Sequence, residues 1–178
     1  MEPPSVTGRG VLVAKQSAVN EAGSLRQDPI DGLAVRPIRP VAHEDGFVTE
    51  VAREVWPEID RPIVQVHVTM TFPDRIRARG MHEASTDRLC GAGPRRNRRV
   101  RRPRGSPSFG QLNEFRLSER NPGLVVIPPM LYHGWKNIGV TEAFIVNTPS
   151  NQYHHEGPDA LDLPYDSPEA KEIVPFRW

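Results

Sequence analysis

The 178-residue sequence has a single cysteine, Cys90, so neither an intramolecular disulfide nor a cysteine-based metal site can form. No apolar run approaches the roughly 20 residues of a membrane-spanning helix. The first residues, Met1 to Ser5, form neither a basic nor an apolar leader segment. We therefore expect a cytoplasmic protein without membrane association, in which any metal would have to be bound by histidines and carboxylates.

Aromatic residues are also scarce, at 7%, whereas 19 prolines and 14 glycines separate short apolar runs. This spacing favours many turns between short strands over a helical bundle. The sequence predicts an all-β sandwich or barrel with short helical turns, as one domain over residues 30–178 that follows a loose N-terminal arm over residues 1–29. The expected strands are Leu33–Ile38, Gly46–Val51, Pro62–Thr71, Arg75–Met81, Gln111–Leu117, Gly123–Ile127 and Thr141–Asn147. Single helical turns are expected at Ala52–Trp56 and Ser167–Glu172.

Positive charge is concentrated in one place, because seven arginines lie within Arg95–Arg104 although the chain has a formal net charge of only +1. No aromatic side chain interleaves with them to stack bases, which disfavours a nucleic-acid partner. A solvated loop and a stretch translated in a shifted reading frame both stay open. Because a core-facing strand cannot bury alternating arginines without partners, we predict that this stretch is extruded or poorly ordered.

One histidine follows an apolar strand and a diproline. Leu124 to Ile127 is an apolar run, Pro128 and Pro129 end it because they lack backbone donors, and His133 comes shortly afterwards. The pattern is typical of a pocket wall.

Seven short segments, taken in order, carry a family resemblance. They are Asp45–Glu50, Val64–His67, Arg79–His82, Gly105–Gln111, Leu117–Asn121, Ile127–Trp135 and Tyr165–Pro168. Their order resembles the dTDP-4-dehydrorhamnose 3,5-epimerase family, which are cupin-fold enzymes of deoxysugar biosynthesis. The resemblance implies a cupin or jelly-roll β-barrel, a homodimer, no metal, no cofactor, and a dTDP-linked 4-keto-6-deoxy sugar as substrate in dTDP-rhamnose biosynthesis.

The same resemblance implies roles for individual residues. His82 takes the place of the family's base, and a neutral imidazole can remove a weakly acidic proton beside a sugar ketone near pH 7. Asp166 is the candidate that orients this base, although Ser167 holds the family's aspartate position. Val146 stands where the family has an acidic tyrosine; Tyr153 and Tyr132 are the alternatives for this acid, and neither follows from the alignment. The expected substrate contacts are Glu50, Gln65, His67, Arg79, Arg88 and His133, with Arg88 at the position of a family lysine.

Two other functions stay open from the sequence. Pro128–Asn137 resembles the second metal motif of metal-dependent cupins, but His82 is followed by Glu83 and Ala84 rather than by a second ligand pair, which leaves too few ligands unless Glu83 turns inward. A non-catalytic sugar-binding cupin is favoured by Val146 and Ser167, since the catalytic set would then be incomplete.

Overall fold

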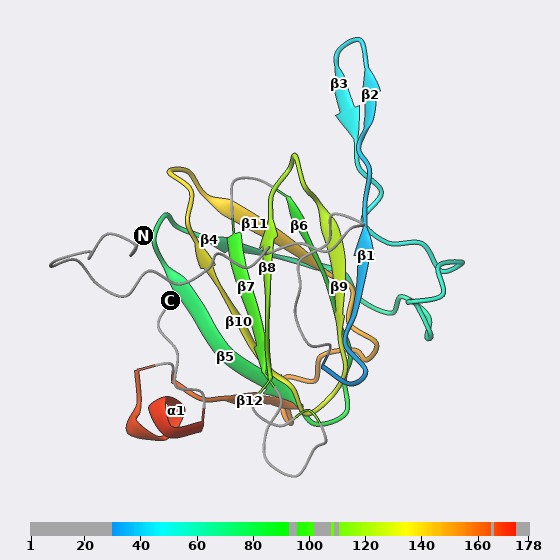
Figure 1. The fold of residues 1–178 in the computed structure, drawn as a ribbon. Helices are drawn as coiled ribbons and strands as arrows, with labels where there is room; N and C mark the ends of the chain where they lie inside the picture. Colours follow the sequence, from blue (N-terminus) through cyan, green and yellow to red (C-terminus); the bar gives the residue numbers. More distant parts are fainter. Residues whose placement is uncertain (1–29, 93–95, 102–107, 109–110, 165, 174–178) are drawn as a thin grey trace, which may run out of the picture.

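Two five-stranded antiparallel sheets make up the fold of the computed structural model, which describes residues 30–92, 96–101, 108, 111–164 and 166–173 (Figure 1). The first sheet has the order β1-β9-β6-β11-β4 and the second has the order β12-β5-β10-β7-β8. The strands of the first sheet are β1 (Ala34–Pro37), β4 (His67–Thr71), β6 (Asp87–Ala92), β9 (Gly123–Ile127) and β11 (Ala143–Asn147). Those of the second are β5 (Ile76–His82), β7 (Arg96–Arg101), β8 (Leu112–Leu117), β10 (Tyr132–Asn137) and β12 (Ala160–Asp162).

Two small elements lie outside these sheets. The hairpin of β2 (Val41–His43) and β3 (Gly46–Val48) extends away from the body of the molecule, and all its residues are exposed (Figure 1). The helix α1 (Pro168–Ile173) is one short segment near the end of the described chain. No helix among the described residues is both long and apolar enough to cross a membrane.

The strand β9 shows why the core forms where it does. All five of its residues are buried, because side chains pack on both of its faces. Val125 and Ile127 join a cluster between the sheets, whereas Leu124 and Val126 pack on the opposite face under the segment that contains Trp56 and Ile59. The strand ends at Ile127 because Pro128 and Pro129 cannot donate to a ladder.

The structure confirms the predicted all-β jelly-roll class, and the expected strand Gly123–Ile127 matches β9 at both ends. The segment Pro62–Val66 is not a strand, however, so β4 begins only at His67. Ala52–Trp56 forms no helix, and a hydrogen bond from Trp56 N–H to the Arg53 carbonyl at 3.0 Å makes it a turn instead. The strands β2, β6, β7, β10 and β12 were not expected from the sequence, since polar residues or glycine interrupt their apolar alternation.

The arginine run also departs from expectation. We predicted an extruded or poorly ordered stretch, but the backbone of Arg96–Arg101 forms β7, which pairs with β10 on one side and β8 on the other. The prediction is therefore wrong for these six residues, because ladder hydrogen bonds from two neighbours hold the strand regardless of its side chains. The remainder of the run, and residues 1–29 of the predicted N-terminal arm, lie outside the described residues.

Candidate active site

A cavity of about 670 Å³ opens between the two sheets. Strands β5 and β10 line it from one sheet, and β4, β6 and β11 line it from the other. The segment that leads into and includes β12 lines it as well, through Asp159 and Ala160. The volume falls within the usual range for small-molecule sites, roughly 300–1,000 Å³.

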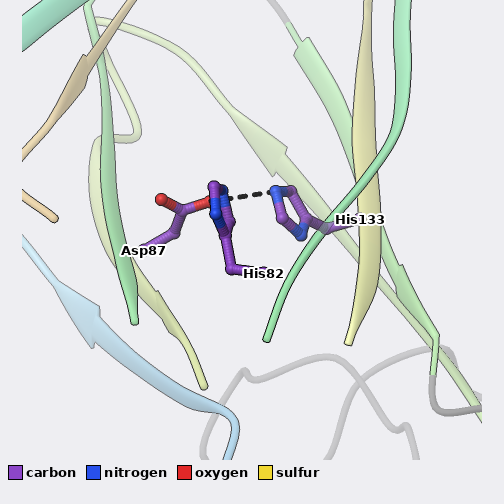
Figure 2. Close-up of side chains that lie close together, drawn as sticks. All are labelled: His82, Asp87 and His133. Carbon is purple, nitrogen blue, oxygen red and sulfur yellow. Dashed lines mark ion pairs between the residues drawn. The ribbon is translucent and has the colours of Figure 1, made fainter. Parts of the chain in front are cut away.

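Three ionisable side chains meet inside this cavity (Figure 2). His82 comes from the end of β5 and His133 from β10, whereas Asp87 comes from the start of β6 in the facing sheet. One carboxylate oxygen, Asp87 Oδ2, lies 3.0 Å from His133 Nε2 and 3.4 Å from His82 Nε2. Asp87 and His133 are buried and His82 is partly exposed. The cluster thus joins the two sheets through one carboxylate.

The hydrogen bonds of His133 and Asp87 indicate which nitrogen carries a proton and how the pKa of Asp87 is changed. Nδ1 of His133 lies 3.0 Å from the Leu131 carbonyl, which can only accept, so this nitrogen carries a proton. Burial alone would raise the pKa of the Asp87 carboxyl, but hydrogen bonds from His133 and His82 outweigh burial and hold that pKa well below its ordinary value of 3.8. Of the two hydrogen bonds, the 3.0 Å contact with Nε2 of His133 lowers the pKa of Asp87 the more.

The second oxygen of Asp87 is also occupied. Oδ1 accepts a hydrogen bond from the side-chain amide of Asn147 at 2.7 Å, and the amide oxygen of Asn147 accepts the backbone N–H of Arg88 at 3.1 Å. Asn147 therefore fixes both the carboxylate and the strand that carries it. A carboxylate with each oxygen bonded has little freedom to rotate.

His82 lies between two carboxylates. Its Nε2 faces Asp87, and its Nδ1 lies 3.7 Å from Oδ2 of Asp159. The hydrogen bond to Asp87 raises the pKa of His82 above its ordinary value of 6.5, and the charge of Asp159 acts in the same direction, although burial opposes both. The ring is stacked on that of His133 with centroids 6.0 Å apart. His82 is accordingly a stronger base than a free imidazole.

Asp159 organises the turn that follows His82. Its Oδ1 accepts the backbone N–H groups of Glu83 at 3.0 Å and Ala84 at 2.9 Å, and its Oδ2 accepts that of Ser85 at 2.8 Å. The neighbouring strand β12 pairs with β5, with Ala160 opposite His82. One side chain thereby connects the β5–β6 turn to the segment that lines the cavity.

Comparisons with known proteins identify the family. No family model matches the chain. The probable low-salt glycan biosynthesis epimerase Agl13 of Haloferax volcanii is 32% identical over 139 residues, which are 77% of this chain and 89% of that protein. The chain belongs to the dTDP-4-dehydrorhamnose 3,5-epimerase family.

Two solved structures agree with this assignment at the level of the fold. A dTDP sugar isomerase from Desulfovibrio desulfuricans G20 has a TM-score of 0.75 at 22% identity, covering 84% of this chain and 92% of that one. The 3,5-epimerase RmlC from Legionella pneumophila, solved with dTDP-4-keto-L-rhamnose, has a TM-score of 0.68 at 20% identity, covering 81% of this chain and 79% of that one. Membership of the epimerase family thus rests on the sequence relative, and the cupin fold rests on these structures.

Several of the candidate site residues named from the sequence do line the cavity. They are His67, His82, His133, Tyr153 and Asp166. Tyr153 is 46% exposed, and its ring meets that of His155 edge to face. The carboxylate beside Nδ1 of His82 is Asp159, whereas the sequence assigned that place to Asp166.

Arg88 requires a correction. Its neighbours in β6, Asp87 and Leu89, line the cavity, so strand alternation directs Arg88 to the opposite face. There its side chain is fully buried and forms an ion pair of 3.1 Å with Asp60. Arg88 is therefore positioned as a structural ion pair, and the predicted substrate contact is not supported.

Two other expected contacts, Glu50 and Gln65, lie away from the cavity lining. Glu50 is exposed near Arg53, with 3.7 Å between the charged groups. Gln65 accepts the backbone N–H of Tyr153 at 2.7 Å, so it fixes a segment that lines the cavity without lining it itself. The side chain of Arg79 lies outside the described part of the structure. Val146 faces away from the cavity, and its neighbours Ile145 and Asn147 line it.

Sequence reasoning missed Asp87, Asp159 and Asn147. Asp87 and Leu89 alternate with Arg88, a pattern that would have shown that only one of Asp87 and Arg88 can face a pocket. No local signal marks Asp159, because it acts on a turn 74 to 76 residues earlier in the chain.

Asp87 adds a third candidate metal ligand, which the sequence analysis did not include. The sequence offered too few ligands for a metal-dependent cupin, and Glu83, the residue that would have had to turn inward, is exposed. In the described structure, His82, Asp87 and His133 are the group whose ligand atoms lie within 4.8 Å of one another, as a metal site requires.

Proposed function

We propose that this protein epimerises a dTDP-linked 4-keto-6-deoxy sugar by removing and returning a proton beside the C4 ketone, with His82 as the base. The observation that carries the proposal is the position of His82, whose imidazole lines the cavity between Asp87 and Asp159. The family of Agl13, a probable glycan biosynthesis epimerase, supports the reaction class. The structure of the Legionella enzyme with dTDP-4-keto-L-rhamnose supports the class of substrate.

Proton abstraction follows from the two carboxylates. With the Nε2 proton held by ionised Asp87, the neutral imidazole keeps its lone pair on Nδ1. When Nδ1 takes the proton from the sugar, the imidazolium lies between Asp87 and Asp159, whose charges stabilise it. Asp159 acts through His82 and is therefore a positioning residue in this scheme.

The negative charge that develops on the ketone oxygen needs a fixed donor. His133 faces the same cavity, and its proton on Nε2 is held by Asp87. Tyr153 is the candidate that returns a proton to the sugar, since its side chain lines the cavity and half of it is open to solvent. A phenol hydroxyl can donate a proton to a carbanion.

The experiment uses solvent deuterium. Incubating the protein with dTDP-4-keto-6-deoxyglucose in deuterium oxide should place deuterium at C3, at C5 or at both, as read by mass spectrometry and proton NMR. His82→Ala should abolish this exchange, whereas His43→Ala, a histidine in the exposed β2–β3 hairpin, should retain it. If folded wild-type protein exchanges neither position, the proposal is wrong, and binding of the nucleotide sugar without exchange would favour a non-catalytic sugar-binding protein.

The proposal includes a homodimer. A row of apolar side chains is exposed along and beside the edge strand β4, at 59% for Val66 and Val68, 40% for Met70 and 58% for Phe72. Phe144, which pairs with Met70 from β11, is 43% exposed and widens the row. A contiguous apolar surface of this kind is typical of a protein interface. Sedimentation at the monomer mass at tens of micromolar would contradict the dimer, and Val68→Lys should weaken it.

A further inference from the structure

We propose that His82, Asp87 and His133 form a binding site for one divalent first-row transition-metal ion. The two imidazole Nε2 atoms and the carboxylate Oδ2 are the candidate ligands, and the three residues that carry them line the cavity with their ligand atoms within 4.8 Å of one another. Two histidines and one carboxylate are a donor set that such ions use with positions left open for water or substrate. Imidazole ligands favour Zn²⁺, Co²⁺ or Fe²⁺ over Mg²⁺ and Ca²⁺, which prefer oxygen.

The separations between the ligand atoms fit a shared ion. Asp87 Oδ2 lies 3.0 Å from His133 Nε2 and 3.4 Å from His82 Nε2, and all three atoms lie within 4.8 Å of one another. Ligand bonds of about 2.0–2.2 Å at angles between octahedral and tetrahedral values put neighbouring ligand atoms about 2.9–3.5 Å apart. The ion would replace the protons that these groups share, with little movement of the side chains.

The groups behind the ligands are those that a metal site needs. A histidine ligand normally donates its other N–H to a carbonyl or a carboxylate, which fixes the ring and the tautomer. Nδ1 of His133 has the Leu131 carbonyl at 3.0 Å, and Nδ1 of His82 has Asp159 at 3.7 Å. The other carboxylate oxygen of Asp87, Oδ1, accepts a hydrogen bond from the side-chain amide of Asn147 at 2.7 Å. His133 and Asp87 are thus held by hydrogen bonds, and His82 has a carboxylate beside its other ring nitrogen.

The three ligands also come from elements that pack rigidly. Asp87 and His133 are only 3% and 7% exposed, and they lie on strands with neighbours on both sides. His82 ends β5, where its carbonyl accepts the backbone N–H of Met130 at 2.7 Å. Since little side-chain entropy remains to be lost, binding of the ion requires no folding step.

A bound ion would occupy His82 Nε2 and leave the proton of the ring on Nδ1, so that no lone pair remains for the sugar proton. This consequence rests on the proposed function, in which the same imidazole removes the sugar proton. The metal-loaded protein should therefore exchange solvent deuterium into the sugar more slowly than the metal-free protein. Metal binding itself does not depend on that reaction.

The test uses full-length untagged protein, stripped with a chelator and titrated with Co²⁺ and, separately, with Zn²⁺. We expect one ion per chain by elemental analysis after dialysis, and visible absorption bands of Co²⁺ held by nitrogen and oxygen ligands. Asp87→Asn and His82→Ala should each weaken Co²⁺ binding by roughly tenfold or more. His43→Ala is the matched control, because it removes an exposed histidine outside the cavity, and it should bind as the wild type does.

Each outcome of the titration supports or overturns the proposed metal site. Wild-type protein that binds no stoichiometric Co²⁺ or Zn²⁺ overturns the proposal, whatever its epimerase activity. Binding that survives in Asp87→Asn and His82→Ala, or that is lost in His43→Ala, overturns the assigned ligands. Circular dichroism of each variant separates loss of a ligand from loss of the fold. Protein that binds Co²⁺ as described but exchanges no deuterium in either form supports the metal site and contradicts the proposed epimerisation instead.

Discussion

Replacing Asp87 by asparagine should destabilise the metal-free protein, and the loss should depend on pH. The carboxylate is 3% exposed and accepts hydrogen bonds from Asn147 at 2.7 Å and from His133 at 3.0 Å. An amide of the same shape keeps one acceptor but turns an NH₂ group toward one of these donors. Losing a hydrogen bond to a charged group costs about 1.5–3 kcal/mol, and the remaining buried imidazolium adds to this unless it loses its proton. We expect about 3 kcal/mol near pH 5.5.

The pH dependence follows from the direction of two shifts. The folded-state pKa of Asp87 is lowered, so its contribution to stability is present above its ordinary value of 3.8 and is lost as pH falls. The folded-state pKa of His82 is raised, so its contribution is present below its ordinary value of 6.5 and is lost as pH rises through the raised value. Asp87→Asn removes the ionised carboxylate on which both contributions to stability depend. Its cost should be largest between about pH 4 and about pH 6.5, and should fall above the raised pKa of His82 to the contribution of Asp87 alone.

Urea unfolding of the chelator-treated protein, followed by tryptophan fluorescence at several pH values, measures this cost. At pH 5.5 the expected loss corresponds to a decrease in Tm of roughly 6–12 °C for a chain of this size. Asp45→Asn, in the exposed turn between β2 and β3, is the matched control and should stay within about 0.5 kcal/mol of wild type. A cost that is the same at all pH values would refute the assignment of an ionised Asp87 beside a protonated His82.

Three further predictions concern the surroundings of the cluster. Asp159→Asn should lower kcat and shift the acidic limb of the pH profile of kcat/KM to lower pH, because the charge beside His82 Nδ1 is lost; an unshifted profile would show that Asp159 only holds the turn. Arg88→Met should leave KM for the sugar nucleotide within about twofold of wild type, since Arg88 pairs with Asp60 outside the cavity; a KM raised tenfold would return it to the substrate site. Gly134→Ala should cost about 1–3 kcal/mol in urea unfolding, because a Cβ there would lie 2.8 Å from the Arg77 carbonyl of the paired strand; wild-type stability would mean that β5 and β10 separate without cost.

Short-range pattern and the family resemblance indicated much of this protein from the sequence alone. Alternating apolar runs between prolines and glycines predicted the all-β class, and the apolar run before Pro128 predicted β9 at both ends. The resemblance placed His82 and His133, and both line one cavity. The strand predictions are local, because both the formation of a strand and its end at a proline depend on neighbouring residues.

Only the tertiary structure decided which acidic residues serve these histidines. A strand places successive side chains on opposite faces, so the register of β6 brings Asp87 into the cavity and turns Arg88 away from it. Asp159 reaches His82 because β12 pairs with β5, although residues 82 and 159 are 77 positions apart in the chain. Pairing between distant strands is set by how the whole core packs, and no run of neighbouring residues encodes it. The sequence determined which histidines could act, and the fold determined which carboxylates set their charge.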